Sequence, residues 1–134
     1  MVLFDTNVFV YAVSTAEKDQ VKRQIARRLL RDEEFSLSLQ VVQEFINTCS
    51  NKARLGKLRE AIAETMNLLL GYPHTSVSSA SICRAYALQS RYQISYWDAA
   101  ILAAAIELGC ATLYSEDLNH GQTYESVQIL NPFL

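Results

Sequence analysis

The chain has 134 residues, half of them apolar, with four glycines, two prolines and a net charge of −2. This composition indicates one compact domain with a substantial core, and no linker, repeat or low-complexity run divides it. The longest nearly uncharged apolar run, residues 99–106, is far shorter than the roughly 20 residues that a membrane-spanning helix needs. The N-terminus lacks the basic region of a signal peptide, so we expect a soluble cytoplasmic protein that does not engage a membrane.

The cysteines argue against two common uses of this residue. Cys49, Cys83 and Cys110 are odd in number, are widely spaced and form no Cys-x-x-Cys pair. Neither a disulfide framework nor a zinc knuckle fits this pattern. We expect all three to fill the core.

Charge is distributed unevenly along the chain. All twelve Lys and Arg residues lie between Lys18 and Arg91, whereas the last 43 residues contain no base. The five acids of that last segment are Asp98, Glu107, Glu116, Asp117 and Glu125. Any cation beside them must therefore come from a distant part of the chain, from a partner or from a metal ion.

The first residues predict a buried strand that ends in polar groups. Val2-Leu3-Phe4 leads into Asp5-Thr6-Asn7, and the apolar residues that follow can begin a helix. In a parallel sheet covered by helices, the groups just past the carboxyl ends of strands form the crevice where ligands bind. A buried carboxylate there is unfavourable unless a cation or hydrogen-bond donors compensate it. Asp5 is thus either a helix cap or part of a ligand site.

Residues 18–31 form a predicted amphipathic helix. Its apolar face consists of Val21, Ile25, Ala26, Leu29 and Leu30. Arg23, Arg27 and Arg31 recur at every fourth position, where like charges cost a few tenths of a kcal/mol per pair. This arginine stripe is either an ordinary solvated face or a surface for phosphates or an acidic partner.

Residues 35–37 are a predicted short strand, followed by a helix from Leu39 to about Asn51 that Ser38 can cap. The inner stripe of this helix is Leu39, Val42, Ile46 and Cys49, and its polar side is Gln40, Gln43 and Asn47. At 100° per residue, Glu44 falls on the border between the two sides. A border carboxylate either points along the sheet edge into a crevice or is a solvated rim residue.

A second amphipathic helix over residues 55–70 makes a helical hairpin with the previous one. Its basic start contains Lys52, Arg54, Lys57 and Arg59. Gly71-Tyr72-Pro73 ends it. Residues 74–77 can form a short strand, and a helix then starts at Ser79 or Ser81 and reaches about Tyr92.

The two histidines do not suggest a metal pair. His74 and His120 have no spacing that would place them as joint ligands. We expect both on the surface.

Residues 95–109 predict a helix packed in the interior, because the stretch between Asp98 and Glu107 is apolar on every side and Gly109 ends it. Ser95 and Asp98 also have the spacing of a capping box. A cap alone would leave half of the acceptor capacity of the carboxylate in a low dielectric, with no Lys or Arg later in the chain. Asp98 is therefore either a cap or a ligand.

The end of the chain repeats the layout of its beginning. Residues 111–114 form a predicted strand that leads into Ser115-Glu116-Asp117, and residues 127–130 form the last strand. The alternation of strands and helices, with connections too long for hairpins, implies an α/β fold, an α/β/α sandwich around a mostly parallel central sheet. Asp5 and Asp117 would share one edge of that sheet.

Four acids can meet only if the chain brings them to one crevice, as a topological switch point does. They are Asp5, Glu44, Asp98 and Asp117. When these four and Glu116 are set aside, nine acids remain against twelve bases, so the rest of the chain carries about +3. Oxygen ligands without paired His or Cys favour Mg²⁺ or Mn²⁺ over Zn²⁺. Such ions serve phosphodiester chemistry, in which one generates hydroxide and another stabilises the leaving oxygen.

These residues resemble the PIN domain ribonucleases, and more narrowly the VapC-type toxins of toxin–antitoxin pairs. The matching marks are Asp5-Thr6-Asn7, Gln43-Glu44-Phe45, Tyr96-Trp97-Asp98-Ala99 and Ser115-Glu116-Asp117-Leu118. The resemblance covers the whole chain and implies a single PIN-like domain over residues 1–134 with Mg²⁺-dependent endoribonuclease activity. It implies that the catalytic metal ligands are Asp5, Glu44, Asp98 and Asp117, supported by Thr6, Asn7, Ser115 and Glu116. Ser115 stands where the family often has Thr and keeps the hydroxyl.

The resemblance also implies partners. A toxin of this type cleaves RNA and is held inactive by a cognate antitoxin, whose tail would cross helices 18–31 and 39–70. An inserted antitoxin Arg would supply the cation that the last 43 residues lack. Toxins of this family also commonly form homodimers, which would bury one more helical face.

Three other readings compete. A phosphoacceptor domain also places Asp after its first strand, but it normally needs a late Lys, and no Lys follows Lys57. A non-catalytic PIN-like RNA-binding module would be expected to have lost acids, whereas all four are present. A housekeeping PIN nuclease would cleave RNA without a dedicated antitoxin.

Overall fold

The computed structural model describes residues 1–52 and 56–134. In chain order, the elements are β1 (Val2–Phe4), α1 (Thr6–Val13), the short 3-10 helix η1 (Glu17–Asp19), α2 (Gln20–Asp32), β2 (Phe35–Ser38), α3 (Leu39–Lys52), α4 (Gly56–Leu69), β3 (His74–Thr75), α5 (Ser79–Tyr92), α6 (Tyr96–Glu107), β4 (Thr112–Tyr114), β5 (Thr123–Tyr124) and β6 (Val127–Leu130). The predicted alternation of strands and helices is confirmed.

One six-stranded sheet runs through the molecule in the order β3-β2-β1-β4-β6-β5. All neighbouring strands are parallel except β5, which runs antiparallel to β6. The chain moves outward from β1 to β2 and β3 and then returns to place β4 on the other side of β1. The topological switch point therefore lies between β1 and β4, where ligands of open α/β sheets bind.

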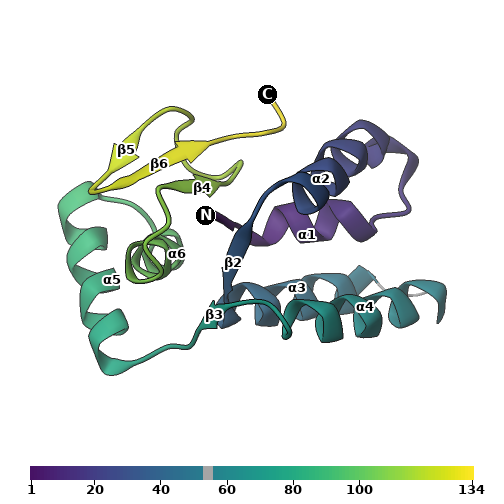
Figure 1. The fold of residues 1–134 in the computed structure, drawn as a ribbon, viewed down its shortest axis with the longest axis horizontal. Coiled ribbons are helices and arrows are strands. Elements are labelled where there is room, and N and C mark those ends of the chain that lie inside the picture. The colour runs from purple at the N-terminus through teal and green to yellow at the C-terminus, as the bar shows by residue number, and fades with distance from the viewer. Residues whose placement is uncertain (53–55) are drawn as a thin grey trace.

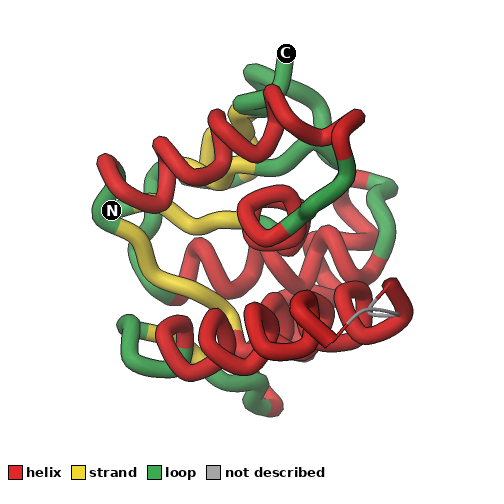
Figure 2. The backbone as a smooth tube through the Cα atoms, turned by 90° about the vertical axis from the view of Figure 1, so that its right-hand side faces the viewer, coloured by secondary structure: helices red, strands yellow, loops and turns green. Residues whose placement is uncertain are grey.

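Helices cover both faces of the sheet. Helices α5 and α6 pack on each other and on the sheet on one side, and α1 to α4 lie on the other (Figure 1). Figure 2 views the molecule from the side that α1 to α4 cover. The predicted α/β/α sandwich with a helical hairpin is confirmed. Within the described residues, no helix has the length and apolar character required to cross a bilayer.

Aromatic packing fixes the first helix against the first strand. Leu3 and Phe4 of β1 are fully buried. The ring of Phe4 lies 6.0 Å from that of Phe9 on α1 and 5.0 Å from that of Phe35 on β2, measured between centroids. Large rings at these separations supply much of the burial energy of a core. The strand-to-helix junction at Asp5 is consequently held from both sides by packed side chains.

The arginine stripe of α2 contributes to the fold. The Nη1 atom of Arg23 donates to the carbonyl of Ser14 at 3.0 Å, and the Nε atom of Arg27 donates to the carbonyl of Ala12 at 2.9 Å. These carbonyls belong to the C-terminal end of α1, where cations are favourable. Arg31 pairs with its exposed neighbour Asp32. Two of the three arginines thus hold α2 against α1, although Arg27 remains exposed to solvent.

Several sequence predictions were wrong in detail. Cys49 and Cys110 are buried, but Cys83 lies exposed on α5 and fills no core. Residues 17–19 form a separate 3-10 turn before α2. The prediction for α5 is confirmed, by contrast: the helix begins at Ser79, one of the two predicted starts, and its cap is Ser78, whose hydroxyl accepts from the backbone N–H of Ser81. The strand β5 has only two residues, too few for an alternating pattern to reveal it.

The helical hairpin is formed by α3 and α4, which pack together. The predicted start of its second helix at Leu55, together with Arg54, lies outside the described residues, and the side chains of Lys52 and Lys57 are likewise not described. Both histidines are exposed, as expected. His120 is also structural, because its Nδ1 accepts a hydrogen bond from the backbone of Asn131 at 2.9 Å.

Candidate metal site

Asp5 stands at the junction of β1 and α1 and is only 3% exposed. Its Oδ1 accepts a hydrogen bond from the backbone N–H of Thr6 at 2.7 Å, which makes it the N-cap of α1. Its Oδ2 accepts from the Ser115 hydroxyl at 2.7 Å, and its own N–H donates to the carbonyl of Tyr114 on β4. Capping and site formation are therefore compatible, because each oxygen accepts only one hydrogen bond and keeps a lone pair.

Two further aspartates meet Asp5 at the switch point. Asp5, Asp98 and Asp117 each offer a carboxylate oxygen, and these three atoms lie within 4.8 Å of one another. Asp117 follows β4, and its N–H donates to the Ser115 hydroxyl at 3.1 Å. Asp98 comes from the first turn of α6, on the opposite face of the sheet from α1. We call Asp5, Asp98 and Asp117 the aspartate cluster.

Asp98 is oriented by its backbone. The Ser95 hydroxyl accepts from the N–H of Asp98 at 3.1 Å, so half of the predicted capping box is present. The reciprocal bond, from the backbone N–H of Ser95 to the Asp98 carboxylate, does not occur among the described residues. The carboxylate is thus not consumed by the cap and faces the other two acids.

The cluster concentrates negative charge in a partly dry place. Burial, more than any other effect, raises the pKa of Asp5 from 3.8 to about 6; the hydrogen bonds from Ser115 and Thr6 oppose this, and the charges of Asp117 and Glu44 add to it. Burial also raises the pKa of Asp117, with further contributions from the charges of Asp98, Glu116 and Glu44. Within the described residues, no Lys or Arg forms an ion pair with the aspartate cluster.

Glu44 lies beside the aspartate cluster but is not a member of it. Both of its carboxylate oxygens accept hydrogen bonds from the protein: Oε2 from the Thr6 hydroxyl at 2.7 Å and Oε1 from the Gln40 amide at 2.8 Å. It lines the same pocket as Asp5 and Asp117. From its border position on α3, the Glu44 side chain thus points into the crevice. The carboxylate oxygens that lie within 4.8 Å of one another nevertheless belong to the three aspartates.

Glu116 has a cation of its own. Its Oε2 lies 3.2 Å from Nζ of Lys22 on α2, and its Oε1 accepts from the Tyr11 hydroxyl at 2.7 Å. The Lys22 ammonium also lies 4.7 Å from the centroid of the Tyr11 ring. The sequence predicts that any cation beside the acids of the last segment comes from elsewhere; for Glu116 it is Lys22, and for Glu125 it is Arg91. The pairing removes Glu116 from the set of uncompensated carboxylates.

Asn7 contributes an unsatisfied acceptor. Its Oδ1 is buried and, within the described residues, accepts no hydrogen bond. Asn7 and Thr6 line the pocket that contains Asp5 and Asp117. Among the described residues, the group consists of three carboxylates without a Lys or Arg partner and one orphan amide oxygen, and it contains no His or Cys. All of its donor atoms are therefore oxygens. These residues fit a hard divalent cation such as Mg²⁺ or Mn²⁺.

Sequence reasoning missed one buried group at this site. Gln40 belongs to the predicted polar side of its helix, yet it is only 8% exposed. This correction has a physical reason: its amide is satisfied by Glu44, so the polar group can be buried. Its position four residues before Glu44 is the signal that could have identified it.

The fold is a mostly parallel α/β/α sandwich, and three carboxylates meet at its switch point, the place where open α/β sheets bind ligands. The family model of the PIN domain matches residues 2–125, so the chain belongs to the PIN domain family. No curated protein matches the chain.

Solved structures of similar fold include the following three. One is a toxin–antitoxin complex from Klebsiella pneumoniae, with 20% identity and a TM-score of 0.74 over 99% of this chain and 98% of that one. VapC20 of Mycobacterium tuberculosis, described as a toxin that cleaves the sarcin–ricin loop, has 17% identity and a TM-score of 0.71 over 87% and 90%. FitAcB from Neisseria gonorrhoeae has 18% identity and a TM-score of 0.70 over 99% of each chain. At these identities the likeness establishes the fold.

Proposed function

We propose that this protein is a Mg²⁺-dependent endoribonuclease, with Mn²⁺ as an alternative ion, and that it is the toxin of a toxin–antitoxin pair. The observation that carries the proposal is the convergence of Asp5, Asp98 and Asp117 within 4.8 Å at the switch point of a PIN domain. Asp5, Glu44, Asp98 and Asp117 are the proposed catalytic and metal-binding residues. A bound divalent ion would supply Lewis-acid chemistry for hydrolysis of the phosphodiester bond.

The chain's own residues prepare this site. Ser115 donates to Asp5 and accepts from the backbone of Asp117, so one buried hydroxyl sets the spacing of two acids. The Thr6 hydroxyl, in the first turn of α1, donates to the Glu44 carboxylate and so helps to hold it in place. The surplus negative charge favours binding of a cation, and the RNA phosphates would then be attracted to that cation rather than repelled by bare carboxylates.

Two alternatives are less well supported. In a phosphoacceptor domain a cationic side chain should lie beside Asp5. In the described part of the chain no Lys or Arg forms an ion pair with the aspartate cluster, and Lys22 is held by Glu116 at the edge of the pocket. A non-catalytic RNA-binding module would have no reason to keep three uncompensated carboxylates close together. A housekeeping PIN nuclease without an antitoxin has the same site and differs only in its partner.

The first experiment is RNA cleavage by the purified protein with Mg²⁺, with EDTA, and with Mg²⁺ restored after EDTA. We expect cleavage only when the ion is present, and the Asp117→Asn variant should not cut. Cleavage that persists in EDTA would contradict the proposal, and absence of cleavage with either ion on several RNAs would favour the binding module.

An antitoxin has a suitable place to bind. A cavity of about 460 Å³ lies between α1, α2 and α4, lined mainly by apolar residues and containing one charged residue, Arg27. Leu68 on its rim is 69% exposed. This cavity supports the expected course of an antitoxin tail across these helices. Co-expression with the adjacent small open reading frame should give a stable complex that suppresses cleavage; an active complex, or none, would favour the housekeeping nuclease.

A homodimer is the expected assembly. Large apolar side chains are exposed on and next to α5 and at the start of α6, namely Val77, Ile82, Tyr86 and Trp97. A second copy covering them would remove this surface from water. Light scattering should give the mass of a dimer, and Tyr86→Asp should shift it toward the monomer. A wild-type monomer at micromolar concentration would contradict this assembly.

A further inference from the structure

We propose that Gln40 is a positioning residue for the metal-dependent reaction, because it holds the Glu44 carboxylate in place beside the aspartate cluster. The inference rests on the proposed function of that site. The observation behind it is that Gln40 is buried one helical turn before Glu44 and that its amide nitrogen lies 2.8 Å from Glu44 Oε1.

The hydrogen bonds around Glu44 leave its carboxylate little rotational freedom. Thr6 donates to Oε2 at 2.7 Å from α1, and Gln40 donates to Oε1 at 2.8 Å from within α3. The two donors come from different helices and engage different oxygens of the same group. Removal of either one frees one oxygen and permits rotation about the remaining bond. A carboxylate that rotates can approach the aspartate cluster or turn toward solvent.

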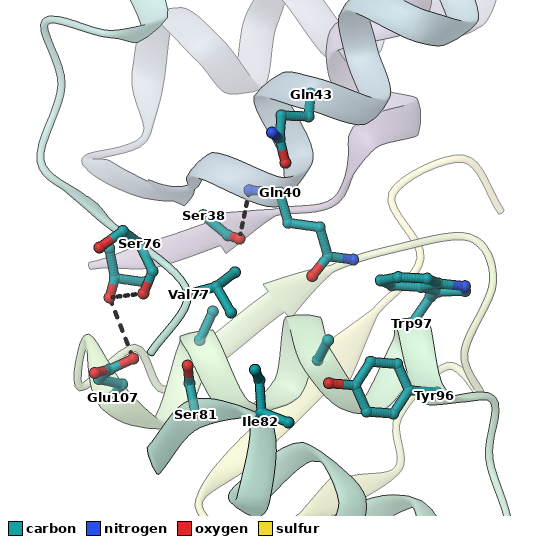
Figure 3. Close-up of a pocket in the computed structure, with 13 residues that line it drawn as sticks. Ser38, Gln40, Gln43, Ser76, Val77, Ser81, Ile82, Tyr96, Trp97 and Glu107 are labelled. Atoms are coloured by element: carbon teal, nitrogen blue, oxygen red, sulfur yellow. Dashed lines mark hydrogen bonds between the residues drawn. The ribbon is translucent and has the colours of Figure 1, made fainter. Parts of the chain in front are cut away.

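The Gln40 side chain is itself fixed. An ionised carboxylate only accepts hydrogen bonds, so Glu44 dictates that the amide nitrogen of Gln40, and not its oxygen, faces it. The backbone N–H of Gln40 donates to the Ser38 hydroxyl at 3.2 Å, and the residue is 8% exposed. Figure 3 shows the side chain extending from the start of α3 beside Trp97, with Gln43 further along the same helix.

Partial burial strengthens this contact: Gln40 is buried, whereas Glu44 is partly exposed. A hydrogen bond from an amide to a charged group in a water-poor place is stronger than the same bond at the surface. Groups that orient metal-site residues in this way typically change metal affinity or activity 10- to 100-fold when removed. Gln40 therefore affects the reaction through Glu44 and has no need to touch the RNA.

Gln40→Met tests the inference, because Met has nearly the same length and no donor. Gln43→Met is the matched control: Gln43 lies on the same helix and lines the same cavities, but it is exposed and, among the described residues, donates no hydrogen bond to Glu44. Both variants and wild type are compared by thermal unfolding in EDTA, by Mn²⁺ binding in calorimetry, and by kcat and KM for RNA cleavage with Mn²⁺.

We expect Gln40→Met to weaken Mn²⁺ binding or lower kcat about tenfold. KM for RNA should change less than threefold, and Gln43→Met should behave as wild type. The Glu44→Gln background separates positioning from simple damage. Since Gln40 acts through the Glu44 carboxylate, Gln40→Met should have almost no additional effect there on Mn²⁺ binding or kcat.

Several results would overturn the inference. Wild-type Mn²⁺ binding and kcat in Gln40→Met, or an equal loss in Gln43→Met, would show that the contact is dispensable. A full tenfold loss in the Glu44→Gln background would show that Gln40 acts by another route. Wild-type protein that neither binds Mn²⁺ nor cleaves RNA would instead refute the proposed function, and this inference with it.

Discussion

Replacing Asp5 with Asn should make the metal-free protein more stable while abolishing its activity. Asn keeps the shape of the side chain and is as good an N-cap as Asp, so the bond from the Thr6 N–H is retained. The charge is lost, and the group facing the Ser115 hydroxyl becomes an amide NH₂, which donates to that hydroxyl instead of accepting from it. The pKa of Asp5 is raised from 3.8 to about 6, a difference of about two pH units, and each unit corresponds to 1.36 kcal/mol. Ionised Asp5 therefore destabilises the metal-free fold at pH 7.5 by up to about 3 kcal/mol.

The pH dependence of this effect has a definite sign. Because the folded-state pKa is the higher one, the folded protein binds the Asp5 proton more tightly than the unfolded chain. The stability contributed by the protonated group is present below pH 3.8 and is lost as the pH rises through about 6. The advantage of Asp5→Asn over wild type should thus be about 3 kcal/mol at pH 7.5 and about 1 kcal/mol at pH 4.5.

Denaturant unfolding in EDTA at the two pH values measures this difference. Glu64→Gln, which removes a charge from the exposed surface of α4, is the control and should change stability by less than about 0.5 kcal/mol at either pH. Mn²⁺ should stabilise wild type but not Asp5→Asn. If Asp5→Asn were less stable than wild type at pH 7.5, or if its advantage were independent of pH, the reasoning from burial of the charge would be refuted.

Other variants probe the neighbours of Asp5. Ser115→Ala removes a hydrogen bond that lowers the pKa of Asp5, so in EDTA it should destabilise the protein by about 2 kcal/mol at pH 7.5 and by less at pH 4.5; an equal loss at both pH values would assign Ser115 to packing alone. Glu116→Gln should keep Mn²⁺ affinity within about threefold of wild type, because Lys22 already neutralises that carboxylate, whereas Asp98→Asn should lower it more than about 100-fold. Calorimetry compares the Mn²⁺ affinities of the two variants. If Glu116→Gln lost more affinity than Asp98→Asn, Glu116 and not Asp98 would be assigned to the metal site.

The mostly parallel sheet and the meeting of Asp5 with Asp117 could be predicted, because strands alternate with helices, two strands end in acids, and parallel strands share an edge. Asp98 could be expected there because its helix lacks any later cation. The partners of the acids could not be predicted. Lys22 reaches Glu116 across 94 positions of sequence, and the choice depends on how α2 packs on α1. A periodic pattern reports which face of a helix is apolar, not which polar group on the border finds a partner.

The same limit explains Gln40. Its place on the helix wheel predicts solvent, and only the position of Glu44 relative to α1 shows that its amide is satisfied when buried. The cysteine prediction failed for a related reason. Cys83 is on a helix whose outer face remains exposed in the single chain, and the sequence does not state which apolar face is covered.

The measurement that tests the central claim most directly is a Mn²⁺ titration in which bound ion and RNA cleavage are followed on the same samples, for wild type and Asp98→Asn. Since the aspartate cluster is proposed to hold the ion that the reaction needs, the cleavage rate should rise in proportion to the bound Mn²⁺. Asp98→Asn should shift both curves together to higher ion concentration. Cleavage at full rate before any Mn²⁺ is bound, or Mn²⁺ binding by Asp98→Asn as tight as by wild type, would contradict the claim.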